Sequence, residues 1–266
     1  MKNRVQPSWR DRFLIAYYRR NWRGLHALMR VNRMRSLRMQ TAPGAVFDLQ
    51  PWEYIDGIIL HEGFYEPEVL EALRPFLGEG AVLWDIGANF GLQAISAACL
   101  APATRVFAFE PNPATFTRLQ NHARLNQVDV SVQPMALGER EGEASLYVND
   151  DGNSGMSSLM HASTGPATTV RVVRGDTLID AGKIPAPTAI KLDVEGGEEF
   201  VLRGLGRHLA SPTLRAVVYE TTAQLLERPA ACAATRELMA AGFKITALPR
   251  AASQAHLLAN FLASRS

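Results

Sequence analysis

Two acids and two glycines stand where the sequence predicts that strands end. The segment Asp85-Ile86-Gly87-Ala88-Asn89-Phe90-Gly91 follows a short apolar run, and Glu110 ends the next predicted strand. Glycines at such a point allow a tight turn and let a ligand approach the main chain. The helix that follows offers free N–H groups to a carboxylate or phosphate. A carboxylate at the tip of the second strand can accept hydrogen bonds from both hydroxyls of a ribose.

The glycine spacing separates two classes of ligand. A dinucleotide site needs Gly-x-Gly-x-x-Gly around the pyrophosphate. Here three residues separate Gly87 from Gly91, and Asp85 precedes them, an acid that would repel a pyrophosphate. An acid suits a ligand whose nearby end is cationic. S-adenosylmethionine has an ammonium, a sulfonium and one carboxylate, and it fits this mixture better than NAD does. The structural alternative is a strand–helix turn with a surface acid.

A second polar run, Lys191-x-Asp193-x-Glu195, ends another predicted strand. Open α/β sheets bind ligands at the carboxyl edge of their strands, and alternate residues of a strand share a face. The three side chains could therefore converge, bind an acceptor hydroxyl and take its proton. The alternative is an ion-paired strand end, with Glu195 or Glu198 capping the next helix. Two carboxylates without further ligands are thin evidence for a hard metal ion, so no metal is expected.

Three motifs in this order resemble the signatures of FkbM-type methyltransferases, which are class I enzymes dependent on S-adenosylmethionine. They are the run at residues 85–91, then Ala108-Phe109-Glu110-Pro111-Asn112-Pro113, then Ile190-Lys191-Leu192-Asp193-Val194-Glu195-Gly196. The resemblance extends from residue 63 to residue 243 and leaves the first fifty residues out. It implies S-adenosylmethionine as cofactor and O-methylation of a hydroxyl on a glycan sugar or a polyketide-like metabolite.

The motifs and the resemblance together predict three groups of site residues. Acceptor activation is expected from Lys191, Asp193 and Glu195. Acceptor binding is expected from Asn153, Ser154 and Ser157 in a polar loop, and from Glu220 at a strand end. A valine at position 87 is expected to abolish cofactor binding and leave the fold largely intact. The residues expected to bind the cofactor are Glu66, Asp85, Gly87, Ala88, Asn89, Gly91, Glu110, Pro111, Asn112 and Ala136.

Alternating strands and helices from residue 81 onward must position these residues. The apolar patterns predict strands at 81–86, 105–109, 128–133, 143–148, 168–173, 188–192, 214–219 and 243–247, and helices at 91–100, 113–126, 198–205 and 222–241. This alternation favours a mostly parallel sheet with helices on both faces. With the resemblance, the expected fold is a doubly wound, mostly parallel seven-stranded Rossmann-like class I methyltransferase sheet with a basic helical N-terminal arm.

Basic residues are concentrated in the first forty residues of the chain, and acidic residues in the rest. Residues 1–40 contain eleven basic residues and one acid, Asp11, while the other residues contain 17 basic and 25 acidic groups. We expect a basic helical arm at 1–50, a methyltransferase domain at 51–250 and a tail at 251–266, with Thr41-Ala42-Pro43-Gly44 ending the arm helix. The arm could lie on an anionic membrane surface, fold onto the acidic body or contact a second copy in a homodimer. Folding onto the body is slightly favoured.

Other features bear on partners and location. An arginine-rich arm could also grip nucleic acid, but the acidic body makes nucleic acid an unfavoured partner, and a non-catalytic cofactor-binding module is a further alternative. No stretch approaches the ~20 apolar residues of a membrane span, and two cysteines are too few for a disulfide scaffold. We therefore expect a cytoplasmic protein that could be peripheral at the inner face of the membrane. His122 is expected to be structural.

Overall fold

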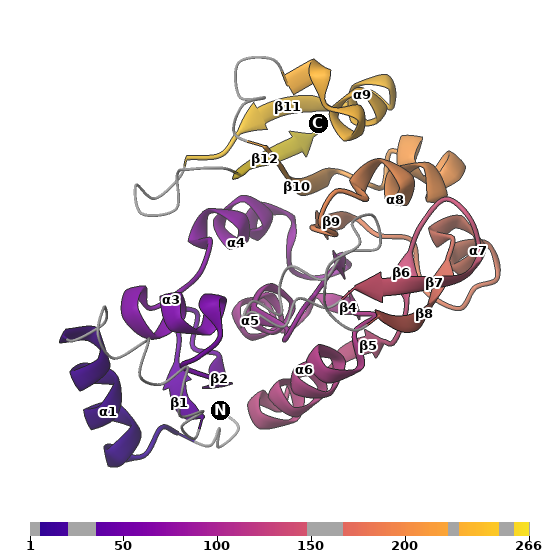
Figure 1. The fold of residues 1–266 in the computed structure, drawn as a ribbon. Helices are drawn as coiled ribbons and strands as arrows, with labels where there is room; N and C mark the ends of the chain where they lie inside the picture. The colour runs from indigo at the N-terminus through magenta and orange to yellow at the C-terminus, as the bar shows by residue number, and fades with distance from the viewer. Residues whose placement is uncertain (1–5, 21–35, 148–166, 223–228, 250–257, 266) are drawn as a thin grey trace.

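A seven-stranded sheet forms the centre of the molecule (Figure 1). The computed structural model describes residues 6–20, 36–147, 167–222, 229–249 and 258–265. The strand order is β11-β12-β10-β9-β3-β4-β5, and β12 is antiparallel to both of its neighbours while the other pairs are parallel. This confirms the predicted mostly parallel, doubly wound sheet. The strands are β3 (Val82–Ile86), β4 (Arg105–Phe109), β5 (Val130–Gln133), β9 (Ala189–Leu192), β10 (Ala216–Thr222), β11 (Lys244–Ala247) and β12 (Leu258–Ser264).

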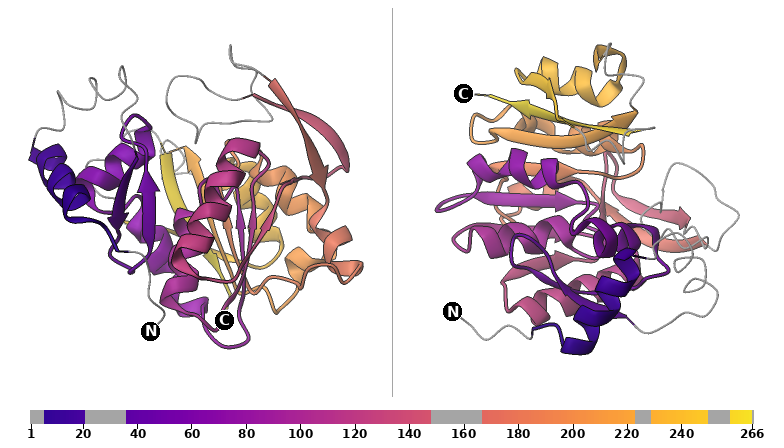
Figure 2. Two further views of the ribbon diagram at one scale, coloured as in Figure 1. Left: turned by 90° about the horizontal axis from the view of Figure 1, so that it is seen from below. Right: turned by 90° about the vertical axis from the view of Figure 1, so that its left-hand side faces the viewer.

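Helices cover both faces of this sheet, because its strands place apolar side chains alternately on either side (Figure 2). Leu83 packs into the first core and Trp84 into the second. The first core is closed by α4 (Pro67–Leu73), α5 (Leu92–Leu100) and α6 (Pro113–Asn126). The second is closed by α7 (Gly175–Asp180), α8 (Glu198–Gly204) and α9 (Ala233–Ala240). Short 3-10 turns are η1 (Arg74–Phe76), η3 (Gly206–Ala210) and η5 (Pro229–Ala231).

The C-terminal tail, one predicted helix and two predicted strands differ in the structure. The C-terminal tail contains β12, which lies between β10 and β11 and buries Ala259, Phe261 and Ala263. Its antiparallel pairing is not signalled by strand–helix alternation, because no described helix separates it from β11. The predicted helix 222–241 is shorter, since β10 continues to Thr222 and α9 begins at Ala233. The predicted strands near 143 and 168 leave the main sheet and form a separate one, composed of β6 (Ala136–Leu137), β8 (Ala167–Val173) and β7 (Gly142–Tyr147).

The N-terminal region is only partly helical. It comprises α1 (Trp9–Arg20), a hairpin of β1 (Leu37–Gln40) and β2 (Val46–Leu49), and α3 (Tyr54–Glu62). The prediction of a helical arm is therefore wrong at 37–49, where alternate residues such as Leu37 and Met39 are buried in a strand pattern. The predicted break does occur, because Gly44 N donates to Thr41 O in the hairpin turn.

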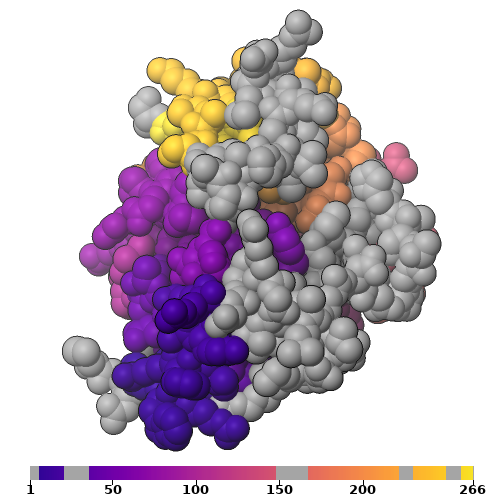
Figure 3. Space-filling model, turned by 60° about the vertical axis from the view of Figure 1, so that its left-hand side comes forward, coloured from indigo at the N-terminus to yellow at the C-terminus, as the bar shows by residue number. Residues whose placement is uncertain are grey.

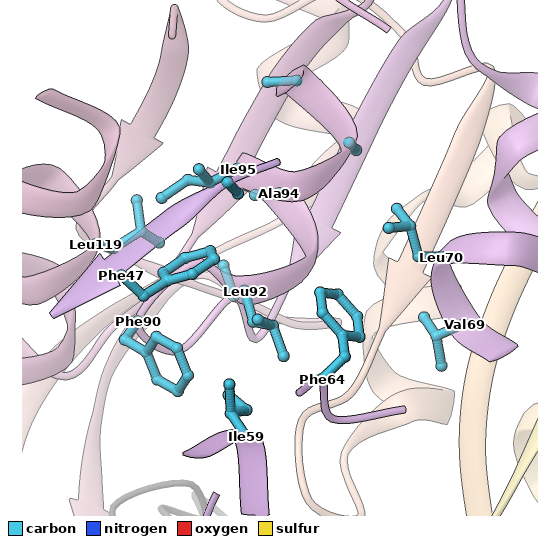
Figure 4. Packing of buried hydrophobic residues seen from close by; sticks show 14 of the residues in the cluster. Phe47, Ile59, Phe64, Val69, Leu70, Phe90, Leu92, Ala94, Ile95 and Leu119 are labelled. Carbon is cyan, nitrogen blue, oxygen red and sulfur yellow. The ribbon is translucent and has the colours of Figure 1, made fainter. Parts of the chain in front are cut away.

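The hairpin and α3 pack directly onto the core beside the seven-stranded sheet. Figure 4 shows Phe47 of β2 and Ile59 of α3 beside Phe90 and Leu92, which lie just after β3. Asn126 fastens the hairpin to α6, since its amide accepts from Val46 N at 2.7 Å and donates to Val46 O at 2.6 Å. Residues 37–49 thus belong to the packed structure rather than to a separate arm.

His122 has the structural role expected of it. Its Nδ1 lies 3.0 Å from Phe90 O and its Nε2 accepts from Asp48 N at 3.1 Å, so the network assigns a neutral ring with the proton on Nδ1. Burial of the ring lowers the pKa of His122 to about 4. The ring therefore ties β2 to α6 only while it is neutral.

Acid should weaken the hydrogen bond by which His122 joins β2 to α6. Because the folded pKa lies below the unfolded value of 6.5, the contribution of His122 is complete above pH 6.5 and is lost as the pH falls toward 4. The loss should be about 3 kcal/mol in the free energy of unfolding at pH 4. Urea unfolding at pH 7 and pH 4.5 should show a smaller drop for His122→Gln than for wild type. His61→Gln should keep the wild-type drop, and an equal drop in all three proteins would refute the assignment.

Candidate active site

The strand order reverses at β3, which pairs with β4 on one side and with β9 on the other. Open α/β sheets bind ligands at the carboxyl edge of such a switch point. The residues that follow β3, β4 and β9 are the three motifs found in the sequence. The fold therefore brings residues 85–91, 108–113 and 190–196 to one edge.

Hydrogen bonds to Phe109 and Glu110 fix the loop after β3. Gly87 N and Ala88 N each donate to Phe109 O at 3.0 Å, so these two N–H groups already have partners. Asn89 N and Asn112 N donate to the two carboxylate oxygens of Glu110, each at 2.8 Å. Burial raises the pKa of Glu110, and the two backbone N–H groups act against that rise. Glu110 is thereby fixed between two loops at the sheet edge.

Gly87 is required by its neighbours as well as by its backbone. It has a φ of +77°, and a Cβ there would lie 1.7 Å from Asp193 O. Any side chain must displace the chain that follows β9. The expectation that valine at 87 leaves the fold largely intact is therefore wrong.

Asp85 and Lys191 face each other across β3 and β9. Asp85 is fully buried: its Oδ2 accepts from Ala94 N at 2.9 Å, and its Oδ1 lies 3.5 Å from Lys191 Nζ. Lys191 also donates to Gly87 O at 2.9 Å and to Asp193 Oδ2 at 3.2 Å. Asp85 is thus paired with a lysine that the sequence analysis did not assign to it, and direct contact with a cofactor stays a prediction.

The charge of Lys191 is stabilised by its neighbours. Burial by itself lowers the pKa of Lys191, but the carboxylates of Asp193, Asp85 and Glu66 outweigh burial and raise it above the ordinary value. Lys191 therefore stays charged and holds the Gly87 loop against the end of β9.

Strand alternation does not reach Glu195, contrary to prediction. β9 ends at Leu192, and Glu195 adopts a left-handed backbone with φ +55°. Glu198 Oε1 accepts from Val194 N and Gly196 N, each at 3.2 Å, so this carboxylate holds the turn. The N-cap of α8 is Gly197, without a side-chain cap hydrogen bond, so Glu198 braces the preceding turn rather than capping the helix as the structural alternative had it. A turn rather than a strand carries Glu195.

Four carboxylates, from the residue before α4, from the turn after β9 and from β10, act on one another's pKa. We call Glu66, Asp193, Glu195 and Glu220 the acidic cluster. Burial, followed by the charge of Asp193, raises the pKa of Glu66 to about 7, that of Glu195 to about 8 and that of Glu220 to about 10. Burial and Glu66 likewise raise the pKa of Tyr65. The cluster therefore has proton-accepting groups near neutral pH and would attract a cation.

Residues missed by the sequence analysis hold Glu66 in place. Glu66 has a left-handed backbone, with φ +52°, at the start of α4. Gln93 Nε2 lies 3.3 Å from both Tyr65 O and Glu66 O, and Asn260 of β12 bonds to Glu66 and donates to Glu68. Each is a single polar residue in an apolar run, and that pattern is the signal that could have found them.

The other predicted residues have varied positions. Gly91 begins α5 with φ +93°, Asn112 caps α6 by accepting from Ala114 N, and Ala136 is buried in β6. Pro111 lies between Glu110 and the cap. Within the described ranges, no group of three His, Cys, Asp or Glu side chains is placed to hold a metal ion. The predicted acceptor residues Asn153, Ser154 and Ser157 lie outside the described residues.

The family of the chain follows from its match to known domains. The family described as the methyltransferase FkbM domain matches residues 85–245. The chain belongs to the FkbM methyltransferase domain family. This confirms the family that the three motifs predicted. The matched region of the FkbM domain begins at Asp85 and includes the glycine loop, Glu110 and the acidic residues after β9 and in β10.

Two relatives and one solved structure are similar to this FkbM domain protein. The hexuronic acid methyltransferase AglP of Haloferax volcanii is 34% identical over 55% of this chain and 59% of its own length. The 31-O-demethyl-FK506 methyltransferase FkbM of Streptomyces tacrolimicus is 28% identical over 56% of this chain and 66% of its own length. The chain thus spans less than two thirds of either relative. A crystal structure of methyltransferase FkbM from Methylobacillus flagellatus is 18% identical, covers 78% of this chain and 52% of its own, and has a TM-score of 0.49.

Proposed function

We propose that this chain is an S-adenosylmethionine-dependent O-methyltransferase that acts on a hydroxyl of a glycan sugar or a polyketide-like metabolite. The observation that carries the proposal is the acidic cluster beside Lys191, on the same sheet edge as the Gly87 loop and Glu110. The relatives' names support the acceptor class, since one is a hexuronic acid methyltransferase and the other a methyltransferase of 31-O-demethyl-FK506.

The residues present fit S-adenosylmethionine. Glu110 offers a buried carboxylate, fixed by two N–H groups, to the ribose hydroxyls. Asn89 Oδ1 is buried and has no hydrogen-bond partner within the described chain, so it is available to a ligand donor. The acidic cluster suits the ammonium and sulfonium charges. These groups would hold the cofactor at this edge of the sheet, beside the Gly87 loop.

The bound cofactor would supply a methyl group on a sulfonium, which is a good leaving group. The protein's own task is then to orient an acceptor hydroxyl and remove its proton as the oxygen becomes nucleophilic. Glu195 is the proposed base, because its pKa of about 8 lies near working pH. Asp193 pairs with Lys191 at 3.2 Å and is the proposed electrostatic partner of the base. Glu220, from β10, is the proposed contact to the acceptor.

The proposal includes the location of the enzyme and the class of its acceptor. We place the enzyme in the cytoplasm, peripheral at the inner face of a membrane, with a small-molecule or glycan acceptor. No helix among the described residues has the length and apolar character needed to cross a bilayer. A homodimer stays a prediction. Negative charge in the acidic cluster disfavours the phosphates of a nucleic acid acceptor.

Product analysis tests the function. Purified protein, S-adenosylmethionine with an isotope-labelled methyl group and three acceptors should be incubated and analysed by mass spectrometry. Transfer RNA is incubated in a parallel reaction, and the three acceptors are a uronic acid glycoside, a neutral glycoside and a macrocyclic polyketide alcohol. We expect the label on an oxygen of at least one. Label on transfer RNA alone would favour the nucleic acid alternative, and cofactor binding without any transfer would favour a non-catalytic module.

Glu110→Gln should weaken cofactor binding. The variant keeps the size of the side chain, removes its charge and replaces one acceptor oxygen, which faces a backbone N–H, with an amide donor. A charge-assisted hydrogen bond of this kind is worth about 1.5–3 kcal/mol. Calorimetry with S-adenosylhomocysteine should show about a 10- to 150-fold loss of affinity. The exposed Glu141→Gln is the matched control and should bind as wild type does. Equal affinity in all three proteins would remove Glu110 from the cofactor site.

A further inference from the structure

The helix α1 has two faces of different character. Asp11, Ile15 and Tyr18 are buried, and their spacing places them on one side of the helix. This side packs against α3 and β1. The part of the arm in α1 therefore does fold onto the body, as the sequence slightly favoured, but only one face of it is used.

The opposite face carries exposed aromatic rings. Trp9, Phe13 and Tyr17 follow each other at intervals of four residues and are 81%, 65% and 51% exposed. Only two other large apolar side chains in the described part of the chain are comparably exposed, Tyr54 on α3 and Met239. Four of the five thus belong to α1 and the adjacent α3. Figure 3 shows α1, in indigo, at the surface of the molecule.

Arginines frame these rings. Arg10 lies on one side of the aromatic row, Arg12 and Arg19 on the other and Arg20 within it, at 100° per residue, and all four are exposed. The single acid of the helix, Asp11, is buried and accepts from Ser8 Oγ at 2.6 Å. The exposed surface of α1 is therefore aromatic and cationic, without an acidic group.

We propose that this outer face of α1 docks on the surface of an anionic lipid bilayer. Tryptophan and tyrosine rings favour the boundary between headgroups and acyl chains. Arginine stems lie along apolar surface while their guanidinium groups reach anionic headgroups. A helix with aromatic residues between arginines has both properties of an interfacial helix.

The docking face is connected to the candidate active site through α3. Arg19 Nε donates to Leu60 O at 2.9 Å in the last turn of α3, and Glu66 of the acidic cluster follows Leu60 by six residues. Six residues span at most about 20 Å. The docking face and the acidic cluster are therefore joined through α3 and a short segment of chain. An acceptor attached to a lipid carrier fits this arrangement, and that part of the inference rests on the proposed function.

Vesicle sedimentation of the full chain tests the docking surface. Vesicles of phosphatidylcholine alone are compared with vesicles that also contain phosphatidylglycerol, at low and at high salt. We expect sedimentation with the anionic vesicles, weakened at high salt because screening shortens the reach of the arginines. Trp9→Ala/Phe13→Ala/Tyr17→Ala and Arg10→Gln/Arg12→Gln/Arg20→Gln should each lower the bound fraction at least about tenfold.

Two control variants match these changes elsewhere on the surface. Met239→Ala and Arg140→Gln/Arg171→Gln/Arg207→Gln alter exposed side chains outside α1 and should sediment as wild type does. Wild type that ignores anionic vesicles at low salt would overturn the proposal, as would equal sedimentation of the aromatic variant. A wild-type dimer that the aromatic change converts to a monomer, without vesicle binding, would assign the face to a second copy instead.

Measurements of cofactor binding and of methyl transfer distinguish failure of the docking surface from failure of the proposed function. All variants should bind S-adenosylhomocysteine as wild type does and should methylate a soluble acceptor equally in the absence of vesicles. Vesicle binding without any methyl transfer would leave the docking surface standing and remove the proposed function. Methyl transfer without vesicle binding would support the proposed function and remove the docking surface.

Discussion

Replacing Glu195 with glutamine should lower the rate of methyl transfer by about 10²- to 10⁴-fold. The change keeps the size of the side chain and removes its ability to take a proton. Burial and Asp193 raise the pKa of Glu195 to about 8, so the carboxylate ionises as the pH rises through that value. The wild-type rate should therefore rise with pH up to about 8, and this dependence should be absent from Glu195→Gln.

Binding measurements separate a base from a structural residue. Glu195→Gln should bind S-adenosylhomocysteine as wild type does, measured by calorimetry. Glu199→Gln is the matched control, because Glu199 is a nearby carboxylate that interacts with Arg203 at 4.0 Å. It should keep the wild-type rate. Full turnover in Glu195→Gln would return Glu195 to a structural role and leave Asp193 as the next candidate, tested by Asp193→Asn.

Replacing Lys191 with methionine should lower the free energy of unfolding by about 3–5 kcal/mol. The lysine is buried and contacts Asp85, Asp193 and the carbonyl of Gly87. Methionine fills much of the same volume but leaves the buried carboxylate of Asp85 without a counter-charge. The loss should appear in urea unfolding of the cofactor-free protein at pH 7.

A second substitution checks the cause. Adding Asp85→Asn to Lys191→Met removes one uncompensated charge and still allows a hydrogen bond from Ala94 N, so part of the stability should return. Lys183→Met, on an exposed lysine, should unfold as wild type does. A loss below about 1 kcal/mol for Lys191→Met would mean that the buried pair contributes no more than an exposed one.

The central strands and the glycine loop could be predicted from the amino-acid sequence. The run 82–86 is buried throughout and the run 106–109 is mostly buried, so local composition identifies both without knowledge of their partners. The acids Asp85, Glu110 and Asp193 directly follow or end such runs. Because parallel strands place their carboxyl ends at one edge, the sequence also placed these acids at one edge of the sheet.

Other features depend on long-range pairing and only the tertiary structure decided them. The Asp85–Lys191 pair forms because β3 lies beside β9. A side chain at position 87 would collide with Asp193 O, which is far along the chain. Glu66 joins the cluster because Gln93 and Asn260 hold its segment. The length of a strand also depends on its tertiary neighbours. β9 ends before Glu195, whereas the C-terminal residues join the sheet as β12. Local residue patterns encode burial and turns, whereas the partner of a buried charge or a sheet edge is set by packing between segments distant in sequence.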